Sequence, residues 1–105
     1  MSRTKRRYVI VRCTDCKASP ESVAASVAEA IERAFGVVGL SYVDPQLVEV
    51  QRGSMYIFSV NREGVDKLLA SLVISAVSGG ISLEVVKVTG SLRKARRVVS
   101  SLAHE

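Results

Sequence analysis

The order of apolar periodicities along the chain constrains its fold more than any other feature. Four short runs are rich in β-branched and aromatic residues, which is typical of strands: residues 8–13, 47–50, 55–60 and 81–88. Two stretches between them, residues 20–35 and the segment after Asn61, repeat apolar residues at helical spacing. This β-α-β-β-α-β order predicts an α+β, ferredoxin-like fold, with an antiparallel sheet and both helices on one face.

Cap and turn residues set the expected boundaries. Ser19, Pro20 and Glu21 combine an N-cap, a proline at the first helical position and an acid in the first turn, so the first helix should begin at Pro20. Gly36 should end that helix as a C-terminal cap. Residues 37–45 are then an unusually apolar loop, which we expect to be partly buried or to cover a partner.

Three further signals concern the elements after that loop. Gly53 predicts a hairpin turn between the second and third strands. Asn61 is expected to cap the second helix. In the last strand the alternation of apolar and polar residues slips at Val85-Val86, which indicates a bulge or a change in what covers the strand.

A further helix is expected from Ser91 onward, because Gly90 permits a turn and Ser91 is a good N-cap. One side of this helix carries Leu92, Ala95, Val98, Val99 and Leu102, and the other carries Arg93, Lys94, Arg96 and Arg97. No acid among residues 91–103 offsets these cations, and the positive end of the helix dipole lies beside them. We predict that the apolar side docks on an edge or the open face of the sheet, while the basic side meets a polyanion.

Positive charge is concentrated at the two ends of the sequence. Residues 1–17 carry six Lys/Arg and one acid, residues 18–90 carry five Lys/Arg and eight acids, and residues 91–102 carry four cations and no acid. Such segregation is typical of a protein that binds nucleic acid. In the predicted fold the first and last strands pair antiparallel, so one basic patch should form where the arm with Arg3, Lys5, Arg6 and Arg7 emerges beside Gly90 and Ser91.

Length and composition narrow the class of protein. A chain of 105 residues, 48% of them hydrophobic, indicates a single domain over residues 1–105, with residues 1–6 as a flexible basic arm. No apolar run reaches the ~20 residues of a membrane span, and the basic start leads into a strand-like run rather than a signal peptide. We therefore expect a cytoplasmic protein without a membrane partner.

No catalytic or metal-binding constellation can be assembled from the sequence. Cys13 and Cys16 form a C-x-x-C pair, but zinc would need two more ligands, and the only histidine is His104. A redox pair would be expected where a helix starts, whereas Pro20 begins the helix several residues later. We interpret the pair as incidental thiols, and we predict no metal site, no cofactor bound by the protein and no catalytic residues.

Aromatic residues on the first and third expected strands can be interpreted in two ways. In RNA-recognition motifs the aromatics of these strands stack on bases, and Tyr8, Tyr56 and Phe58 lie there. Such residues are more often core or interface. We assign Tyr56 and Phe58 to a protein interface, together with four residues of the apolar loop: Val37, Val38, Leu40 and Tyr42.

Several segments in order resemble the archaeal ribonuclease P protein component 2 family, which is related to a small eukaryotic ribonuclease P/MRP subunit. They are Arg7-Tyr8-Val9-Ile10, Phe35-Gly36-Val37-Val38-Gly39, Leu47-Val48 and Ile57-Phe58-Ser59-Val60-Asn61-Arg62. The strongest is Val88-Thr89-Gly90-Ser91-Leu92-Arg93-Lys94-Ala95, which looks like the family segment Val-Ser-Gly-Thr-Ile-Lys/Arg-Lys-Ala. The likeness extends from Arg7 to Val99.

The resemblance implies an RNA-recognition-motif-like α/β sandwich with an extra basic helix. It implies a non-catalytic subunit that binds and stabilises the catalytic RNA of ribonuclease P, which removes the 5′ leader from precursor tRNA using Mg²⁺ held by the RNA. It also implies association with component 3, in a heterotetramer around a homodimer of this subunit. The residues expected to bind RNA are then Arg3, Lys5, Arg6, Arg7, Gly90, Ser91, Arg93, Lys94, Arg96 and Arg97.

The alternative is a regulatory domain that binds a small molecule. Such domains share the ferredoxin-like element order and can have glycine after the first helix. They would have no need of a helix with four cations on one side.

Overall fold

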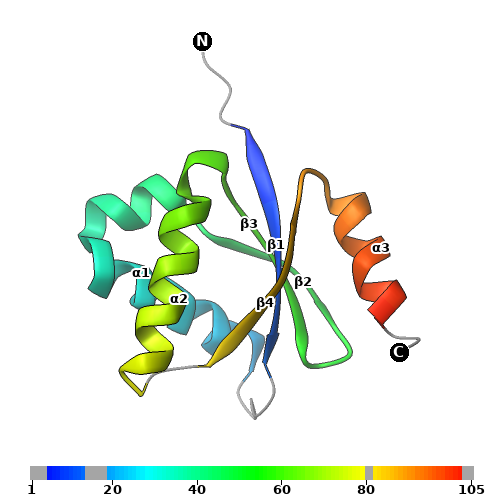
Figure 1. Ribbon diagram of the computed structural model, residues 1–105, viewed down its shortest axis with the longest axis horizontal. Helices are drawn as coiled ribbons and strands as arrows, with labels where there is room; N and C mark the ends of the chain where they lie inside the picture. Colours follow the sequence, from blue (N-terminus) through cyan, green and yellow to red (C-terminus); the bar gives the residue numbers. More distant parts are fainter. Residues whose placement is uncertain (1–4, 14–18, 80–81, 103–105) are drawn as a thin grey trace.

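Four antiparallel strands form one sheet in the order β2-β3-β1-β4. The computed structural model describes residues 5–13, 19–79 and 82–102. In these ranges the elements are β1 (Arg6–Cys13), α1 (Pro20–Val43), β2 (Gln46–Gln51), β3 (Met55–Asn61), the 3-10 helix η1 (Arg62–Gly64), α2 (Val65–Val77), β4 (Leu83–Thr89) and α3 (Leu92–Leu102) (Figure 1). This topology confirms the predicted ferredoxin-like fold.

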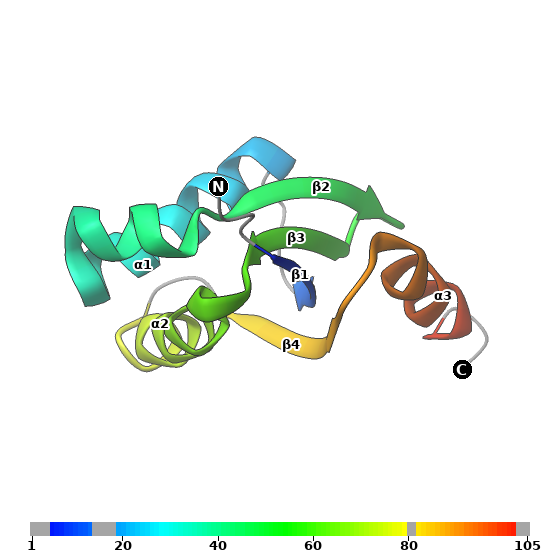
Figure 2. The same cartoon turned by 90° about the horizontal axis from the view of Figure 1, so that it is seen from above.

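The sheet separates two apolar layers, because successive strand residues point to opposite faces. On one face, α1 and α2 cover a cluster that includes Val9, Val11, Tyr56, Phe58 and Val60. On the other face, α3 packs Ala95 and Val99 against Ile10, Met55 and Ile57. Figure 2 shows the resulting arrangement, with α1 and α2 on one side of the sheet and α3 on the other. Of the two positions predicted for α3, the structure shows the open face.

Helix α1 is longer than predicted and is kinked at Gly36. Gly36 has φ 76°, in the region that L side chains rarely adopt, so it interrupts the helix as expected. The chain then resumes a helical path to Val43, where Asp44 adopts φ 47° and donates its backbone N–H to the carbonyl of Leu40. The prediction of a loop over residues 37–45 is therefore wrong. Val43 is fully buried, and this packing stabilises the second helical segment.

Each edge strand carries a bulge that changes the face on which the later residues of the strand lie. In β4, Val85 pairs with Val11 and Lys87 pairs with Ile10, so Val86 is the extra residue. This confirms the predicted irregularity at Val85-Val86. In β2, Leu47 pairs with Phe58 and Glu49 pairs with Ile57, so Val48 is extra. Both bulges have the same consequence, since Lys87 and Glu49 come to lie on the face that α3 covers.

Asn61 does not cap the second helix, contrary to the prediction. Asn61 makes no side-chain cap bond; its Oδ1 accepts from Arg6 and its Nδ2 donates to the carbonyl of Tyr42. A short 3-10 turn intervenes before α2 begins at Val65. Gly64 allows this turn to approach α1 closely, because a Cβ there would stand 2.6 Å from the Cα of Val43.

Candidate nucleic-acid interface

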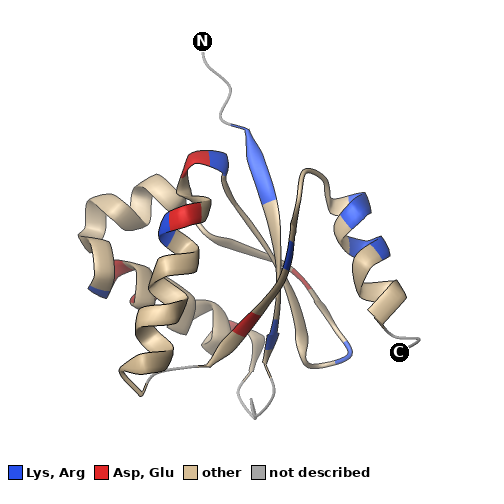
Figure 3. Ribbon diagram, viewed as in Figure 1, with Lys and Arg blue, Asp and Glu red and all other residues tan. Residues whose placement is uncertain are grey.

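Helix α3 is built as predicted, with one docked side and one solvent-facing side. Ser91 caps it by accepting the backbone N–H of Lys94 at 3.2 Å, and its carbonyl accepts from Ala95. Ala95 and Val99 are buried against the sheet, and Leu92, Val98 and Leu102 pack around them. All four cations of the helix are exposed. Figure 3 shows Lys and Arg, and no Asp or Glu, along the described part of α3.

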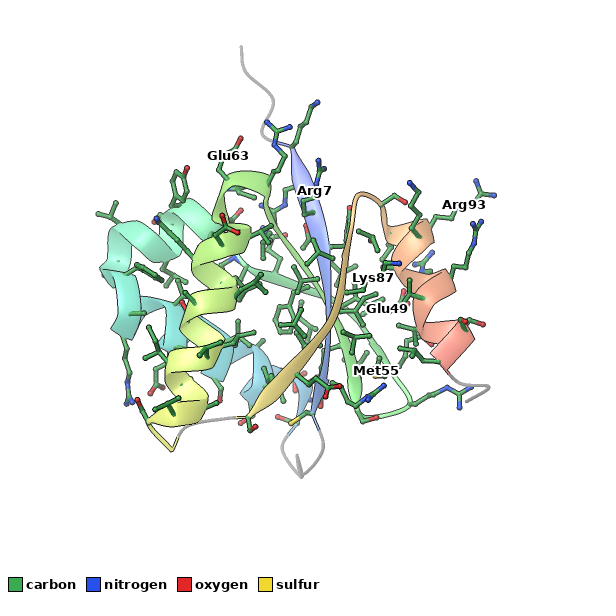
Figure 4. All side chains as sticks on the ribbon, viewed as in Figure 1. Arg7, Glu49, Met55, Glu63, Lys87 and Arg93 are labelled. Carbon is green, nitrogen blue, oxygen red and sulfur yellow. The ribbon has the colours of Figure 1, made fainter. Side chains whose placement is uncertain are left out.

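The four cations of α3 divide between its two flanks and its crest. Arg96 lies on the flank toward β2, where its Nε and Nη2 donate to Oε1 of Glu49 at 2.9 and 2.8 Å. Lys94 and Arg97 lie on the opposite flank, toward β4. Arg93 is exposed on the crest and extends outward in Figure 4.

Arg96 and Glu49 form an ion pair that links α3 to β2. The hydrogen bond from Arg96, and a second one from Gln51, hold the pKa of Glu49 below its ordinary value. The same bond raises the pKa of Arg96. The sequence predicts that Arg96 contacts RNA together with its neighbours, but its guanidinium is already engaged by a carboxylate. Its main effect in the structure is to tie α3 to β2.

A shallow groove of about 430 Å³ lies between the end of β4 and the first two turns of α3. It is lined by Lys87, Val88, Thr89 and Gly90 on the strand side and by Lys94, Arg97 and Val98 on the helix side. Three cations thus face one groove, and no acid lines it. Lys87 is absent from the residues predicted to bind RNA, although the slip at Val85-Val86 was the signal that could have found it.

The start of β1 lies beside this groove, as the strand order predicts. Tyr8 pairs with Thr89, and Nη1 of Arg7 lies 4.0 Å from the position that a Cβ on Gly90 would occupy. Arg7 therefore lies beside Gly90 at one end of the groove, without lining the groove itself. Lys5 is exposed nearby in the chain, and its carbonyl accepts the backbone N–H of Arg62 at 2.8 Å. Arg3 lies outside the described residues.

Arg6, in contrast to Arg7, is bonded to other residues of the protein. Its five N–H groups donate to Oγ of Ser59, Oδ1 of Asn61, Oδ2 of Asp44 and the carbonyls of Ser59 and Asp44, at 2.8–2.9 Å. These bonds tie β1 to β3 and to the end of α1. The prediction of a flexible arm is therefore wrong at Arg6, and all five donors of its guanidinium are used within the protein. Its contact with RNA stays a prediction.

Apolar side chains are exposed on the opposite side of the molecule, on α1 and α2. Of the predicted interface residues, Val37, Val38 and Tyr42 are exposed, with Val38 at 83%, whereas Leu40 packs partly against the core. The ammonium of Lys67 lies 5.2 Å from the ring of Phe35 and 5.4 Å from the ring of Tyr42. Three exposed residues of α2 were not predicted from the sequence: Val73, Ile74 and Val77.

The prediction that Tyr56 and Phe58 form a protein interface is wrong. Their side chains are 1% and 2% exposed and belong to the core under α1 and α2. Because both rings are buried, they cannot stack on bases of an RNA. Tyr8 lies on the other face and packs against the cluster that α3 covers.

Cys13 is a core residue rather than an incidental thiol. It is 4% exposed, packs in the cluster under α1 and α2, and is disulfide-bonded. Cys16 lies outside the described residues. Among the residues that the structure describes, no three His, Cys, Asp or Glu side chains are grouped as metal ligands. Nor is any helix in these ranges both long and apolar enough to cross a bilayer.

Residues 6–100 match the family model described as the Rpp14/Pop5 family. The chain belongs to the Rpp14/Pop5 family. Membership in this family implies that the chain is a protein subunit of ribonuclease P, which is an endoribonuclease. A comparison with curated proteins gave no match. The small-molecule regulatory domain considered as the alternative is not favoured by this membership.

Membership in the Rpp14/Pop5 family gives the two surfaces a context. A ribonuclease P subunit works in a complex with RNA and with other proteins. Cations of β4 and α3 line the groove beside α3, whereas exposed apolar residues lie on α1 and α2.

Proposed function

We propose that this chain is the archaeal-type component 2 of ribonuclease P, a non-catalytic subunit that binds and stabilises the catalytic RNA. The holoenzyme would remove the 5′ leader from precursor tRNA, and the Mg²⁺ ions that perform the chemistry would be bound by the RNA. The observation that carries this proposal is the cationic surface that β1, β4 and α3 build together on a member of the Rpp14/Pop5 family.

The physical role of this surface would be to neutralise phosphate repulsion in the folded RNA. Six cations on it have no ion-pair partner within the described part of the chain: Lys5, Arg7, Lys87, Arg93, Lys94 and Arg97. Each phosphate neutralised on a duplex contributes about 0.9 to the slope of log K against log salt. If all six engage, affinity should fall about a thousandfold between 50 and 200 mM salt.

The apolar side would hold protein partners. Val37, Val38 and Tyr42 are exposed on α1, and Val73 and Val77 are exposed on α2. Monomeric proteins rarely leave large apolar patches uncovered. We assign these residues to contacts with component 3 and with a second copy of this chain, in the heterotetramer that the sequence resemblance implies. The complex would work in the cytoplasm.

Purification of the tagged chain from its native source tests the proposal. The RNA that accompanies the chain should remove the 5′ leader from a precursor tRNA when Mg²⁺ is supplied. The control is the tagged chain with Arg93, Lys94 and Arg97 replaced by Gln, which should recover less of that RNA. Recovery of no RNA, or of RNA without leader-removing activity, would contradict the proposal, and stabilisation by a metabolite would support the regulatory alternative.

A further inference from the structure

We propose that the groove between β4 and α3 is a binding site for the RNA backbone phosphate, in which Lys87 is a main contact. This inference rests on the proposed function and goes beyond it, because Lys87 is separated from the basic helix in sequence. The site would be formed by Lys87 on one wall and by Lys94 and Arg97 on the other, with Arg7 at the end next to Gly90.

The bulge in β4 is what brings Lys87 to this groove. Leu83 and Val85 face the core under α1 and α2, so simple alternation would point residue 87 into that core. The extra residue, Val86, instead packs in the cluster under α3, and Lys87 comes after it on the same face, exposed and opposite Ile10. Figure 4 shows Lys87 between β4 and α3. Bulges often re-aim a side chain in this way at functional sites.

The cations in the groove have no acidic partner within the described part of the chain, whereas Arg96 on the other flank of α3 has one. The bulge in β2 delivers Glu49 to the other flank of the helix, where it neutralises Arg96. On the β4 flank, by contrast, neither Lys87, Lys94 nor Arg97 has an ion-pair partner among the described residues. Three cations that converge on one groove without an acid repel one another. A polyanion relieves that repulsion.

Gly90 keeps one end of the groove open. Its φ is not in the left-handed region, and a Cβ would meet only Nη1 of Arg7, at 4.0 Å. The backbone therefore does not require glycine at this position. The space that the missing side chain leaves lies next to the guanidinium of Arg7, where a phosphate oxygen can approach both the cation and the main chain.

The test is the salt dependence of binding to transcribed ribonuclease P RNA from the native source. Lys87→Gln should weaken binding about fivefold at 0.15 M salt and lower the slope of log K against log salt by about 0.7–0.9. Lys87→Arg should retain the slope. The matched control is Arg33→Gln, which removes one exposed cation from α1 on the other side of the sheet and should leave the slope unchanged. Circular dichroism and thermal unfolding should be unaltered, because Lys87 is exposed.

The outcomes separate the two proposals. If the wild-type chain shows no salt-dependent binding to the RNA, the proposed function fails. If the wild-type chain binds but Lys87→Gln behaves like Arg33→Gln, the groove inference alone is overturned. Inorganic phosphate, added at constant ionic strength, should not compete with the RNA, since a single small anion lacks the counterion release of a polyanion. Competition at millimolar phosphate would identify a free-phosphate site and overturn the inference.

Discussion

Replacement of Arg6 by Met should destabilise the protein by about 1.5–4.5 kcal/mol, although Arg6 stands at the first residue of a strand. Two of its five hydrogen bonds go to Asp44, whose side chain is 51% exposed, and contribute little. The other three go to Oγ and the carbonyl of buried Ser59 and to Oδ1 of Asn61. Each such bond is worth about 0.5–1.5 kcal/mol, which gives the total.

Urea unfolding followed by circular dichroism measures this loss, and Arg12→Met is the matched control on the same strand. Arg12 makes one solvent-accessible ion pair with Glu84, so its replacement should cost less than about 1 kcal/mol. Arg6→Lys should recover little stability, because an ammonium cannot bond to the same set of acceptors. Equal effects of the Arg6 and Arg12 replacements would refute the structural role of Arg6.

RNA binding by the same variants separates structure from recognition. Arg6→Met should keep the wild-type salt slope, since its guanidinium is saturated inside the protein. Arg7→Met should lower the slope by about 1 with little loss of stability. A lowered slope for Arg6→Met, without destabilisation, would show that Arg6 belongs to the RNA-binding surface after all.

Three further outcomes are expected. Arg96 holds the pKa of Glu49 below its ordinary value of 4.5. The free energy of unfolding lost in Glu49→Gln should therefore be constant above about pH 5 and shrink as pH falls below 4.5. A pH-independent difference in unfolding free energy would contradict this. Phe58→Ala should cost about 3–5 kcal/mol in urea unfolding, as a core residue would, and a loss below 1 kcal/mol would return Phe58 to the surface. Val37→Ser with Val38→Ser should reduce self-association in light scattering without changing stability; unchanged association would place the contact elsewhere.

The fold could be predicted because each element carries its own local signal. The strand order is implied by the β-α-β-β-α-β pattern, and the apolar side of α3 matches the residues that pack on the sheet. The error at residues 37–45 has a local origin, since Gly36 does interrupt α1 but the chain resumes a helix to bury Val43. A glycine marks the position at which a helix is broken but does not determine the conformation of the residues after it.

The site was harder to predict because it depends on long-range contacts. The partners of Arg6 lie 38 to 55 residues away, so nothing near Arg6 in the sequence distinguishes it from Arg7. The burial of Tyr56 and Phe58 did have a signal, since β3 is almost continuously apolar and such runs are covered on both faces. Lys87 required the position of a bulge, which fixes the face of every later residue in the strand.

The magnesium dependence of leader removal tests the central claim most directly. Ribonuclease P RNA, component 3 and this chain should be combined with precursor tRNA, and cleavage should be measured against Mg²⁺ concentration with and without the chain. We predict cleavage at modest Mg²⁺ only when the chain is present, and a higher Mg²⁺ requirement when Lys87, Lys94 and Arg97 are replaced by Gln. The account is contradicted if cleavage depends on Mg²⁺ in the same way in all three reactions: with the wild-type chain, with the variant, and without either.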